Sequence, residues 1–406
     1  MKIVYMKFGI IKERKNPPDR RVVFSPQKLQ EFQNQFPQAT IVVETSDIRV
    51  YSDEAYAKAG FEITEDLSDC DVLIGVKEVP IAALLPNKKY FFFSHTIKKQ
   101  PYNRALLQAI LEKNITLYDH EVITDSRGNR LIGFGRYAGI VGAYNGFRAY
   151  GLQNNTFQLP KATGLKDQQE LIATLKTIDV PNLKILLTGS GKVARGAQEM
   201  LDGMNLRAVS VTEYLSTNFD EPVYCKVDVL DYNKRLDGQV LSNRDFYNNP
   251  SEYESDFMRF AKVTDYFIAG HFFGDGSPFL ITKEDAKSPD FKIKLIADIS
   301  CDIKGPIVST LRASTITDPI YGYDPKTSTE VAYTAPGAIT VMAVDNLPCE
   351  LPKDASDGFG ELFLSHVIPA FFNGDKDDIL ARAAMTNAQQ LTSRYEYLQG
   401  YVNGEE

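Results

Sequence analysis

Short apolar runs alternate along the chain with longer segments in which apolar residues recur at helical spacing. In the N-terminal part, the runs that predict strands are Ile41–Val43, Val72–Val76, Tyr90–Phe93 and Ile115–Tyr118. The segments that predict helices are Ser25–Phe36, Asp53–Ala59 and Tyr102–Glu112. This alternation is typical of a parallel sheet covered by helices on both faces.

The pattern starts again after residue 182. The second set of predicted strands is Lys184–Thr188, Arg207–Val211, Asp265–Ala269 and Lys294–Ile299. The chain is therefore predicted to be an α/β protein with two doubly wound, Rossmann-like parallel sheets and a cleft between them. No short-period repeat and no low-complexity tract interrupts this arrangement.

Two further segments bear on how the halves are joined. Phe134–Leu152 carries small residues at helical spacing, which predicts a helix packed closely against another element. Beyond about residue 335 the chain is punctuated by prolines and then predicts an amphipathic helix over Phe359–Phe372. Since this tail is too small for a domain, we expect it to return and pack on one of the other two.

Composition excludes several classes of protein. The 406 residues suggest two or three domains, and a net charge of −8 argues against a nucleic-acid partner, which needs a basic face. No apolar run approaches the roughly 20 residues of a spanning helix, and the N-terminus lacks the pattern of a secretory signal. The four cysteines form no CxxC pair and the histidines no metal-like cluster. We therefore expect a cytoplasmic enzyme with reduced thiols, no metal and no membrane contact.

A glycine-rich turn follows the run Lys184–Thr188 directly. The pattern G-x-G-x-x-G/A is matched by Gly189, Ser190, Gly191, Lys192, Val193 and Ala194, and a helical segment comes next. The first glycine allows the tight turn, and the second lets the backbone approach a pyrophosphate. The start of the helix presents free N–H groups to that anion. The turn therefore predicts a dinucleotide-binding site.

The choice of dinucleotide depends on the next predicted strand. Roughly 20 residues after the turn, Glu213 lies near the end of Arg207–Val211, where a carboxylate accepts from the ribose 2′-OH of NAD. A solvated loop carboxylate explains Glu213 equally well. Arg207 beside a 2′-phosphate favours NADP instead, so both cofactors stay open. No GxxxxGK[ST] motif occurs, which argues against an ATPase.

Ionisable side chains also follow the strands of the first sheet. Lys77, His95 and Glu121 each come just after one of the predicted strands. Because ligands of parallel α/β sheets bind outside the carboxyl ends of the strands, these side chains are expected to share one crevice. A lysine close to a second cation and partly desolvated suits general-base work near neutrality. Each residue alone is explained by a strand-end charge or a core histidine, but together they favour an acid–base site.

Four other residues are weaker candidates. Arg21 and Arg130 carry guanidinium groups that match a carboxylate, although ordinary surface arginines do the same. Asp298 and Asp302 come at the end of the predicted strand Lys294–Ile299. One of these aspartates either orients an imidazole or has a structural role.

These motifs, in this order, resemble a known family. VLIGVKEVP and YFFFSHTIKKQ, within residues 72–100, are similar to the lysine–2-oxoglutarate reductase (saccharopine dehydrogenase, L-lysine-forming) family. That family lies within the superfamily of alanine dehydrogenase and the transhydrogenase N-terminal domain. The likeness is greatest to the reductase half of bifunctional aminoadipic semialdehyde synthase. It continues through DRRVVFSP (19–26), GNRLIGFGRYAGIVG (128–142), LTGSGKVARGAQ (187–198), DFYNNPSEYESDF (245–257), ADISCDIKGPI (297–307) and VDNLPCELPKDAS (344–356).

The resemblance implies roles for individual residues. Lys77 and His95 match the acid–base pair, Glu121 an acidic residue beside it, and Asp302 an aspartate that faces the histidine. Arg21 and Arg130 match arginines that bind substrate carboxylates, and Asn346 matches a substrate contact near the nicotinamide. The resemblance also implies a discontinuous substrate and catalytic domain, residues 1–140 plus 335–406, and a dinucleotide-binding domain, residues 141–334.

The expected activity follows from this resemblance. It is an NAD- or NADP-dependent oxidoreductase of lysine metabolism that condenses L-lysine with 2-oxoglutarate to saccharopine, or the reverse, acting on a CH–NH bond. One alternative is alanine dehydrogenase or another small amino-acid dehydrogenase. A second is a non-catalytic nucleotide-binding homologue, against which the presence of Lys77, His95 and Asp302 together argues. The expected partners are these small molecules, and self-association stays open.

Overall fold

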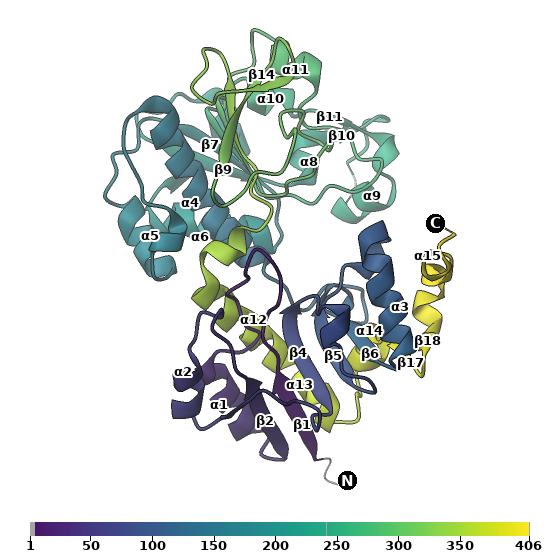
Figure 1. Cartoon of the computed structure of the whole chain (residues 1–406). Coiled ribbons are helices and arrows are strands. Elements are labelled where there is room, and N and C mark those ends of the chain that lie inside the picture. Colours follow the sequence, from purple (N-terminus) through teal and green to yellow (C-terminus); the bar gives the residue numbers. More distant parts are fainter. Residues whose placement is uncertain (1–4, 241, 406) are drawn as a thin grey trace. The chain divides into compact units, whose positions relative to one another are not determined.

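The computed structural model describes residues 5–240 and 242–405. The chain divides into two compact units (Figure 1). Unit 1 consists of Met1–Phe134 and Pro352–Glu406, and unit 2 is Gly135–Leu351. Each unit contains one large sheet with helices against it, which confirms the predicted α/β class.

Unit 1 is built on a six-stranded sheet in the order β3-β2-β1-β4-β5-β6, in which every pair is parallel. Its strands are β1 (Met6–Ile10), β2 (Ala39–Glu44), β3 (Glu62–Thr64), β4 (Val72–Lys77), β5 (Lys89–Phe93) and β6 (Thr116–Asp119). Its N-terminal helices are α1 (Pro26–Gln35), α2 (Asp53–Lys58) and α3 (Arg104–Glu112). The sequence predicted four of these strands and all three helices, but neither β1 at the centre of the sheet nor β3 at its edge.

The C-terminal segment completes the core of unit 1. Its elements are α12 (Pro352–His366), α13 (Ile368–Phe372), α14 (Ile379–Ala383), the short pair β17 (Thr386–Asn387) and β18 (Gln390–Leu391), and α15 (Gln399–Asn403). Phe363 packs edge-on against Phe91 of β5, and Phe371 packs edge-on against Phe8 of β1. The single helix predicted over Phe359–Phe372 is two helices, because Pro369 has no N–H to continue the first.

Unit 2 contains an eight-stranded sheet in the order β15-β14-β16-β13-β12-β7-β9-β8. Its strands are β7 (Lys184–Thr188), β8 (Arg207–Ala208), β9 (Val223–Val227), β12 (Tyr266–Ala269), β13 (Leu295–Asp298), β14 (Ile320–Asp324), β15 (Thr329–Val331) and β16 (Ile339–Met342). The neighbouring strands from β8 to β16 all pair in parallel. Strand β14 pairs antiparallel with both of its neighbours, β16 and β15.

The remaining elements of unit 2 lie around this sheet. Its helices are α4 (Gly135–Asn154), α5 (Gln168–Leu175), α6 (Lys192–Gly203), α7 (Val211–Ser216), α8 (Val229–Tyr232), α9 (Asn243–Asn248), α10 (Met258–Ala261) and α11 (Lys283–Lys287). A small antiparallel pair is formed by β10 (Asn233–Arg235) and β11 (Tyr253–Ser255).

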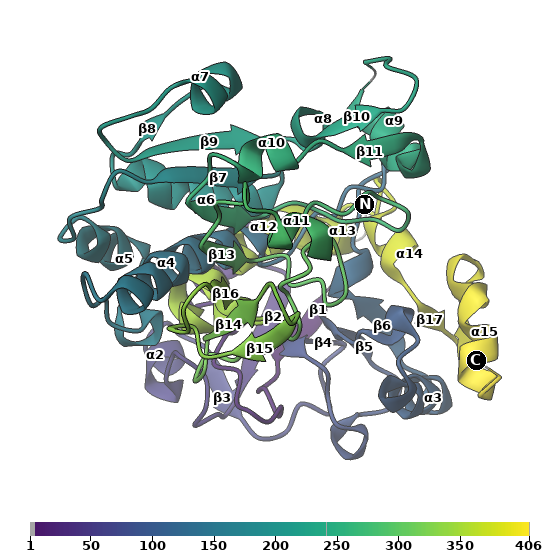
Figure 2. The ribbon, with the colours of Figure 1, turned by 90° about the horizontal axis from the view of Figure 1, so that it is seen from above.

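The predicted strand Arg207–Val211 is wrong over its second half. The strand ends at Ala208, and Val211 already begins α7, because Ser210 caps that helix by accepting from the Glu213 N–H. The strand beside β7 is therefore β9, and β8 lies outside it at the edge of the sheet (Figure 2).

The chain leaves unit 2 later than residue 335, where the sequence placed the return. Strand β16 pairs with β13 and β14 in the sheet of unit 2, and the unit extends to Leu351. The apolar run Ile339–Met342 is a buried strand. Prolines lie on both sides of it in the sequence, and for this reason the run was assigned to the C-terminal tail.

Glycines bring α4 and α6 into backbone contact. A Cβ on Gly139 would lie 1.9 Å from the Val193 carbonyl oxygen, and a Cβ on Gly196 would lie 1.9 Å from the Arg136 carbonyl oxygen. Both distances are far below van der Waals contact, so neither position accepts a side chain without separating the helices. This confirms the close packing predicted for the helix over Phe134–Leu152.

Replacing Gly139 with alanine is expected to destabilise unit 2 by about 1–3 kcal/mol or more, because the added methyl group forces α4 away from α6. Gly164→Ala is the matched control, since a Cβ there meets nothing within 4 Å. Urea unfolding of both variants checks this expectation. Equal midpoints for the two variants would contradict the close contact.

A buried carboxyl group joins α4 to the short 3₁₀ helix η7 (Leu347–Glu350) in unit 2. The Asn145 amide donates to Glu350 Oε1 at 2.8 Å, and Glu350 is 3% exposed. Burial raises the pKa of Glu350 from 4.5 to about 7. The folded state therefore holds a proton on this group that the unfolded state releases at lower pH.

This group should make the stability of the protein depend on pH. Because the folded pKa is the higher one, its contribution is greatest below about pH 4.5 and decreases as pH rises to about 7. Glu350→Gln keeps an oxygen for Asn145 but no longer titrates. Between pH 5 and pH 8 the wild type should therefore lose about 2–3 kcal/mol of unfolding free energy relative to the variant. The exposed Glu65→Gln is the control, and parallel profiles would refute the assignment.

Candidate functional site

Lys77 is the last residue of β4, where the pairing of this strand with β5 becomes irregular. The register shifts between Ile74 and Lys77, and Lys77 pairs with Phe93, two residues before His95. The buried Glu13 carboxylate accepts from the backbone N–H groups of Val76 and Lys77 at 2.6 and 2.8 Å. Burial raises the pKa of Glu13 to about 8. The main chain that carries Lys77 is thus held by a carboxyl group from the segment after β1.

His95 follows β5 with a left-handed backbone, at φ 55°. Its Nδ1 lies 3.2 Å from Glu121 Oε2, and its ring stacks on Phe93 with centroids 6.1 Å apart. Lys98 Nζ, which only donates, lies 3.3 Å from the same Nδ1, whereas the Glu121 carboxylate only accepts. The Glu121 contact is the shorter of the two, and on that ground we assign the ring proton to Nδ1. The other nitrogen, Nε2, is then the one that accepts a proton.

Asp119, the last residue of β6, positions both His95 and Glu121. Its buried carboxylate accepts from the N–H groups of Ser94, His95 and Glu121 at 2.9, 3.1 and 2.7 Å, and also from the Ser94 hydroxyl. Burial raises the pKa of Asp119. The sequence did not single out this residue, although its place between a buried strand and two predicted site residues was the available signal.

Two cations lie near the Glu121 carboxylate. Lys98 Nζ and Arg130 Nη2 are 3.5 and 3.8 Å from Oε1. Burial opposes ionisation of Glu121, but the His95 hydrogen bond and these positive charges outweigh it and lower the pKa to about 2. Glu121 is therefore ionised throughout the neutral range.

Arg21 is buried and already paired. Its Nε and Nη2 donate to the two oxygens of Asp19 at 3.0 and 2.6 Å, and its guanidinium lies 4.2 Å from the ring centroid of Phe134. Burial raises the pKa of Asp19, but the charges of Arg21 and Lys77 hold it below its ordinary value. Asp19 therefore takes one edge of the Arg21 guanidinium, and the substrate contact predicted for Arg21 stays a prediction.

In unit 2 the glycine-rich turn has the geometry that a dinucleotide needs. Gly189 has φ +104°, and a Cβ on it would lie 2.6 Å from the Gly270 carbonyl oxygen, so only glycine suits this position. A Cβ on Gly191 would meet nothing within 4 Å, which leaves open space in front of the turn. Helix α6 starts there without a side-chain cap, so its first N–H groups face that space.

A cavity of about 360 Å³ lies against this turn. Its lining consists of Gly189, Ser190, Gly191, Lys192, Val193, Val229, Tyr247, Gly270, His271 and Phe272. Tyr247 and Phe272 at its rim are 45% and 71% exposed, with ring centroids 6.3 Å apart. Five of the six predicted cofactor residues of the turn line the cavity, and Ala194 is buried in α6 behind them. The residues present thus fit a dinucleotide.

Glu213 lies away from this strand end. It forms a capping box with Ser210 in α7, after the edge strand β8. The strand next to β7 ends at Val227, so the carboxylate in the position expected for a ribose ligand is that of Asp228. Asp228 also caps a helix, α8, and accepts from the Val229 N–H and the Asn243 amide, each at 2.8 Å. The sequence missed Asp228, although a buried run followed by an aspartate was the signal. The ribose role predicted for Glu213 remains a prediction, as does that of the turn residues.

The other predicted residues of unit 2 stand at two strand ends. Asp298, at the end of β13, accepts from the Cys301 N–H and the Thr310 hydroxyl, so it holds its own loop. Asp302 is half-buried, and burial raises its pKa. Asn346 precedes η7. Lys77, His95, Glu121, Arg21 and Arg130 lie in unit 1, and the contact of Asp302 with the histidine stays a prediction.

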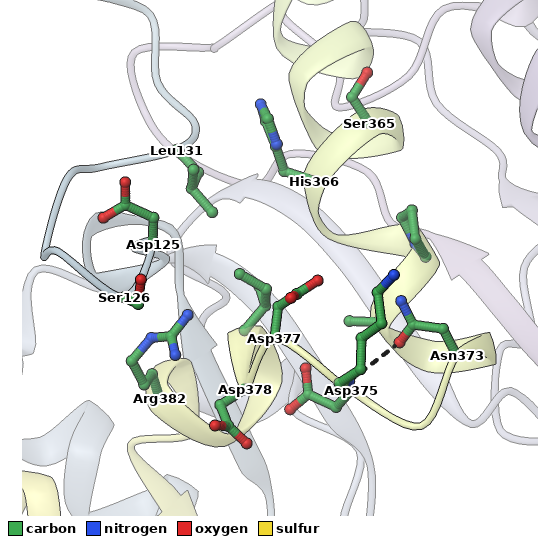
Figure 3. Close-up of a pocket in the computed structure, with 14 residues that line it drawn as sticks. Asp125, Ser126, Leu131, Ser365, His366, Asn373, Asp375, Asp377, Asp378 and Arg382 are labelled. Carbon is green, nitrogen blue, oxygen red and sulfur yellow. Dashed lines mark hydrogen bonds between the residues drawn. The ribbon is translucent and has the colours of Figure 1, made fainter.

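Unit 1 has a larger cavity, of about 670 Å³, that contains none of the predicted catalytic or substrate residues in its lining. It lies between the Asp125–Leu131 loop and the ends of α12, α13 and α14, with His366 across from Asp378 and Arg382 (Figure 3). It is therefore distinct from the acid–base cluster. Among the described residues, no three His, Cys, Asp or Glu side chains are grouped so as to hold a metal ion.

The comparisons with known proteins first indicate a class. Residues 9–141 match the family "Alanine dehydrogenase/PNT, N-terminal domain". An L-alanine dehydrogenase has a similar structure, with a TM-score of 0.63 at 16% identity over 98% of this chain and all of that one. A transhydrogenase from Sinorhizobium meliloti matches with a TM-score of 0.60 at 15% identity, over 95% of this chain and all of that one. These structures show a shared fold.

The curated relatives are more specific. The chain is 28% identical to alpha-aminoadipic semialdehyde synthase of Arabidopsis thaliana, over 96% of this chain and 41% of that protein. The mitochondrial synthase of Mus musculus is also 28% identical, over 88% and 44%. The chain thus spans less than half the length of these relatives. A saccharopine dehydrogenase [NAD(+), L-lysine-forming] of Yarrowia lipolytica is 24% identical, over 81% of this chain and 83% of that protein. These similarities confirm the resemblance and support an oxidoreductase that uses a nicotinamide cofactor.

No helix in the described part of the chain is both long enough and apolar enough to cross a membrane.

Gly191→Ala separates the fold of the turn from its binding role. The added methyl group meets open space in the protein, so the melting temperature should stay that of the wild type. It occupies the space where a pyrophosphate approaches, so affinity for NADH should fall by about tenfold or more. Calorimetry with NADH and NADPH measures this, with Gly164→Ala as the control. Unchanged affinity for both would show that the turn does not hold the dinucleotide.

Proposed function

We propose that this chain is a nicotinamide-dependent oxidoreductase that joins L-lysine to 2-oxoglutarate through a C–N bond, forming saccharopine, or runs the reverse reaction. The observation that carries the proposal is the group formed by Lys77, His95 and Glu121 at neighbouring strand ends of unit 1. The names of the relatives support it, since one group is described as saccharopine dehydrogenase, L-lysine-forming.

The chemistry requires proton transfer at every stage. The ε-amine of lysine adds to the ketone carbon of 2-oxoglutarate, and loss of one water gives an imine. Hydride then reaches the imine carbon and a proton reaches the nitrogen, which leaves a secondary amine. Groups that both give and take protons are therefore needed beside the reacting nitrogen and oxygen, and each contributes about 10²–10⁴-fold in rate.

His95 and Lys77 are the groups proposed for this work. Because Glu121 accepts from His95 Nδ1, the other ring nitrogen, Nε2, is the atom proposed to exchange protons with the substrate. Lys77 stands on a main chain that Glu13 holds in place. Glu121 itself stays ionised, so its proposed role is to orient and stabilise the charged imidazole.

The substrates carry several carboxylates, and the cations beside His95 suit them. 2-Oxoglutarate has two carboxylates and saccharopine has three. Lys98 and Arg130 are 48% and 45% exposed and stand over Glu121, where they can also meet a substrate carboxylate. Arg130 is the more accessible of the two predicted arginines, because its side chain is 45% exposed and that of Arg21 only 3%.

We further propose that unit 1 is the substrate and catalytic domain and unit 2 the dinucleotide-binding domain. When bound, the nicotinamide supplies or accepts the hydride. The turn Gly189–Ala194 would hold the pyrophosphate, and the Asp228 carboxylate would accept from the ribose 2′-OH and disfavour a 2′-phosphate, which favours NAD. Asp302 and Asn346 keep the substrate-side roles that the resemblance implies.

The test follows the absorbance of NADH and NADPH with lysine and 2-oxoglutarate. Turnover should require both substrates and prefer NADH. Lys77→Met should lower kcat by about 100-fold or more with unchanged NADH affinity, because it removes a proton-transfer group and leaves unit 2 intact. Lys58→Met, at an exposed position of α2, is the matched control.

Other outcomes separate the alternatives. Turnover with pyruvate and ammonia, and none with lysine, would indicate an alanine dehydrogenase, the alternative that the family match over residues 9–141 supports. NADH binding without turnover of either substrate set would indicate a non-catalytic homologue. Full activity of Lys77→Met would refute the mechanism.

A further inference from the structure

His271 is a buried histidine beside the glycine-rich turn that no step described above uses. It follows β12 and Gly270, is 6% exposed, and lines the cavity formed with Gly189, Gly191 and Lys192. Its Nδ1 lies 2.7 Å from Thr188 Oγ1, at the end of β7. The Ser300 hydroxyl donates to its carbonyl oxygen at 2.6 Å, so the residue is held at both its ring and its main chain.

The second ring nitrogen of His271 has no partner. Nε2 is inaccessible to solvent and makes no hydrogen bond to any residue that the structure describes. Such groups are rare inside proteins, because a buried polar atom without a partner is costly. Burial lowers the pKa of His271 to about 4, so the ring is neutral and carries one proton.

The contact with Thr188 decides where that proton is. The Thr188 hydroxyl makes no other hydrogen bond within the described part of the chain. When it donates to Nδ1, the hydroxyl proton is satisfied and the ring proton lies on Nε2. The opposite arrangement leaves the hydroxyl proton without an acceptor in the buried interior. Nε2–H is therefore a donor that needs an acceptor.

We infer that His271 is a further nucleotide-binding residue, and that its Nε2–H donates to a phosphate oxygen of the bound dinucleotide. The cavity it lines is the one into which the uncapped start of α6 directs its N–H groups. Because Nε2 is inaccessible to solvent as the ring stands, the ring must shift toward the cavity before a phosphate group there can supply the acceptor that the protein lacks. The inference rests on the dinucleotide of the proposed function, but not on the amino-acid substrates.

Two substitutions test the roles of the two ring nitrogens of His271 separately. The amide of asparagine reaches the position of Nδ1, where its oxygen can accept from Thr188, and that of glutamine extends to the position of Nε2, where its nitrogen can donate. His271→Asn therefore keeps a partner for Thr188 and loses the proposed phosphate donor, whereas His271→Gln does the reverse. Calorimetry with ADP-ribose, ADP and adenosine measures binding, and thermal unfolding measures the structural effect.

His271→Asn should lower the affinity for ADP-ribose and ADP about tenfold or more, whereas the affinities of His271→Gln should stay within about threefold of the wild type. Adenosine should bind all three proteins with the same affinity. The reverse order would show that His271 acts only through Thr188 and would overturn the inference. Equal affinities for ADP-ribose in all three proteins, or no binding of it by the wild type, would also overturn it. If the expected order is found but lysine and 2-oxoglutarate are not turned over, the inference stands and only the proposed reaction fails.

Discussion

The hydrogen bonds of the Asp119 carboxylate are the interactions on which the predicted acid–base cluster of unit 1 depends. A buried carboxylate is costly unless it is fully hydrogen-bonded, and here the partners are three main-chain N–H groups and a hydroxyl. Those N–H groups converge only if the chain turns sharply after β5. His95 accordingly takes a left-handed backbone that non-glycine residues seldom adopt. The position of the imidazole and that of Glu121 thus follow from one acidic side chain between them.

The same construction recurs elsewhere in the chain. Glu13 holds the end of β4, and Asp298 holds the loop after β13. Burial raises the pKa of each, to about 8 and about 6. Both carboxyl groups hold the main chain beside a predicted site residue, and for Asp298 this favours the structural one of the two roles that the sequence left open.

Much of this architecture was predictable, for a local reason. Buried strands appear as apolar runs, and the carboxyl ends of parallel strands meet at one edge, so Lys77, His95 and Glu121 could be grouped from the sequence alone. Sheet order is not local, which is why the ribose contact was expected from Glu213 after the predicted strand Arg207–Val211 and Asp228 was missed. Partners are not local either. Nothing in the sequence showed that Arg21 would be paired with Asp19, or that Ser210 would take Glu213 into a helix cap.

The split of unit 1 also bears on how the chain acquires its structure. The core of this unit needs Phe359, Phe363 and Phe371, which the ribosome adds only after the whole of unit 2. Unit 2 is continuous and can close on itself during synthesis, whereas the N-terminal sheet waits with one apolar face uncovered. Contacts of such long sequence separation form slowly and leave apolar surface exposed to aggregation in the meantime. Assembly of the predicted acid–base cluster is thus tied to a segment that is made after the whole of unit 2.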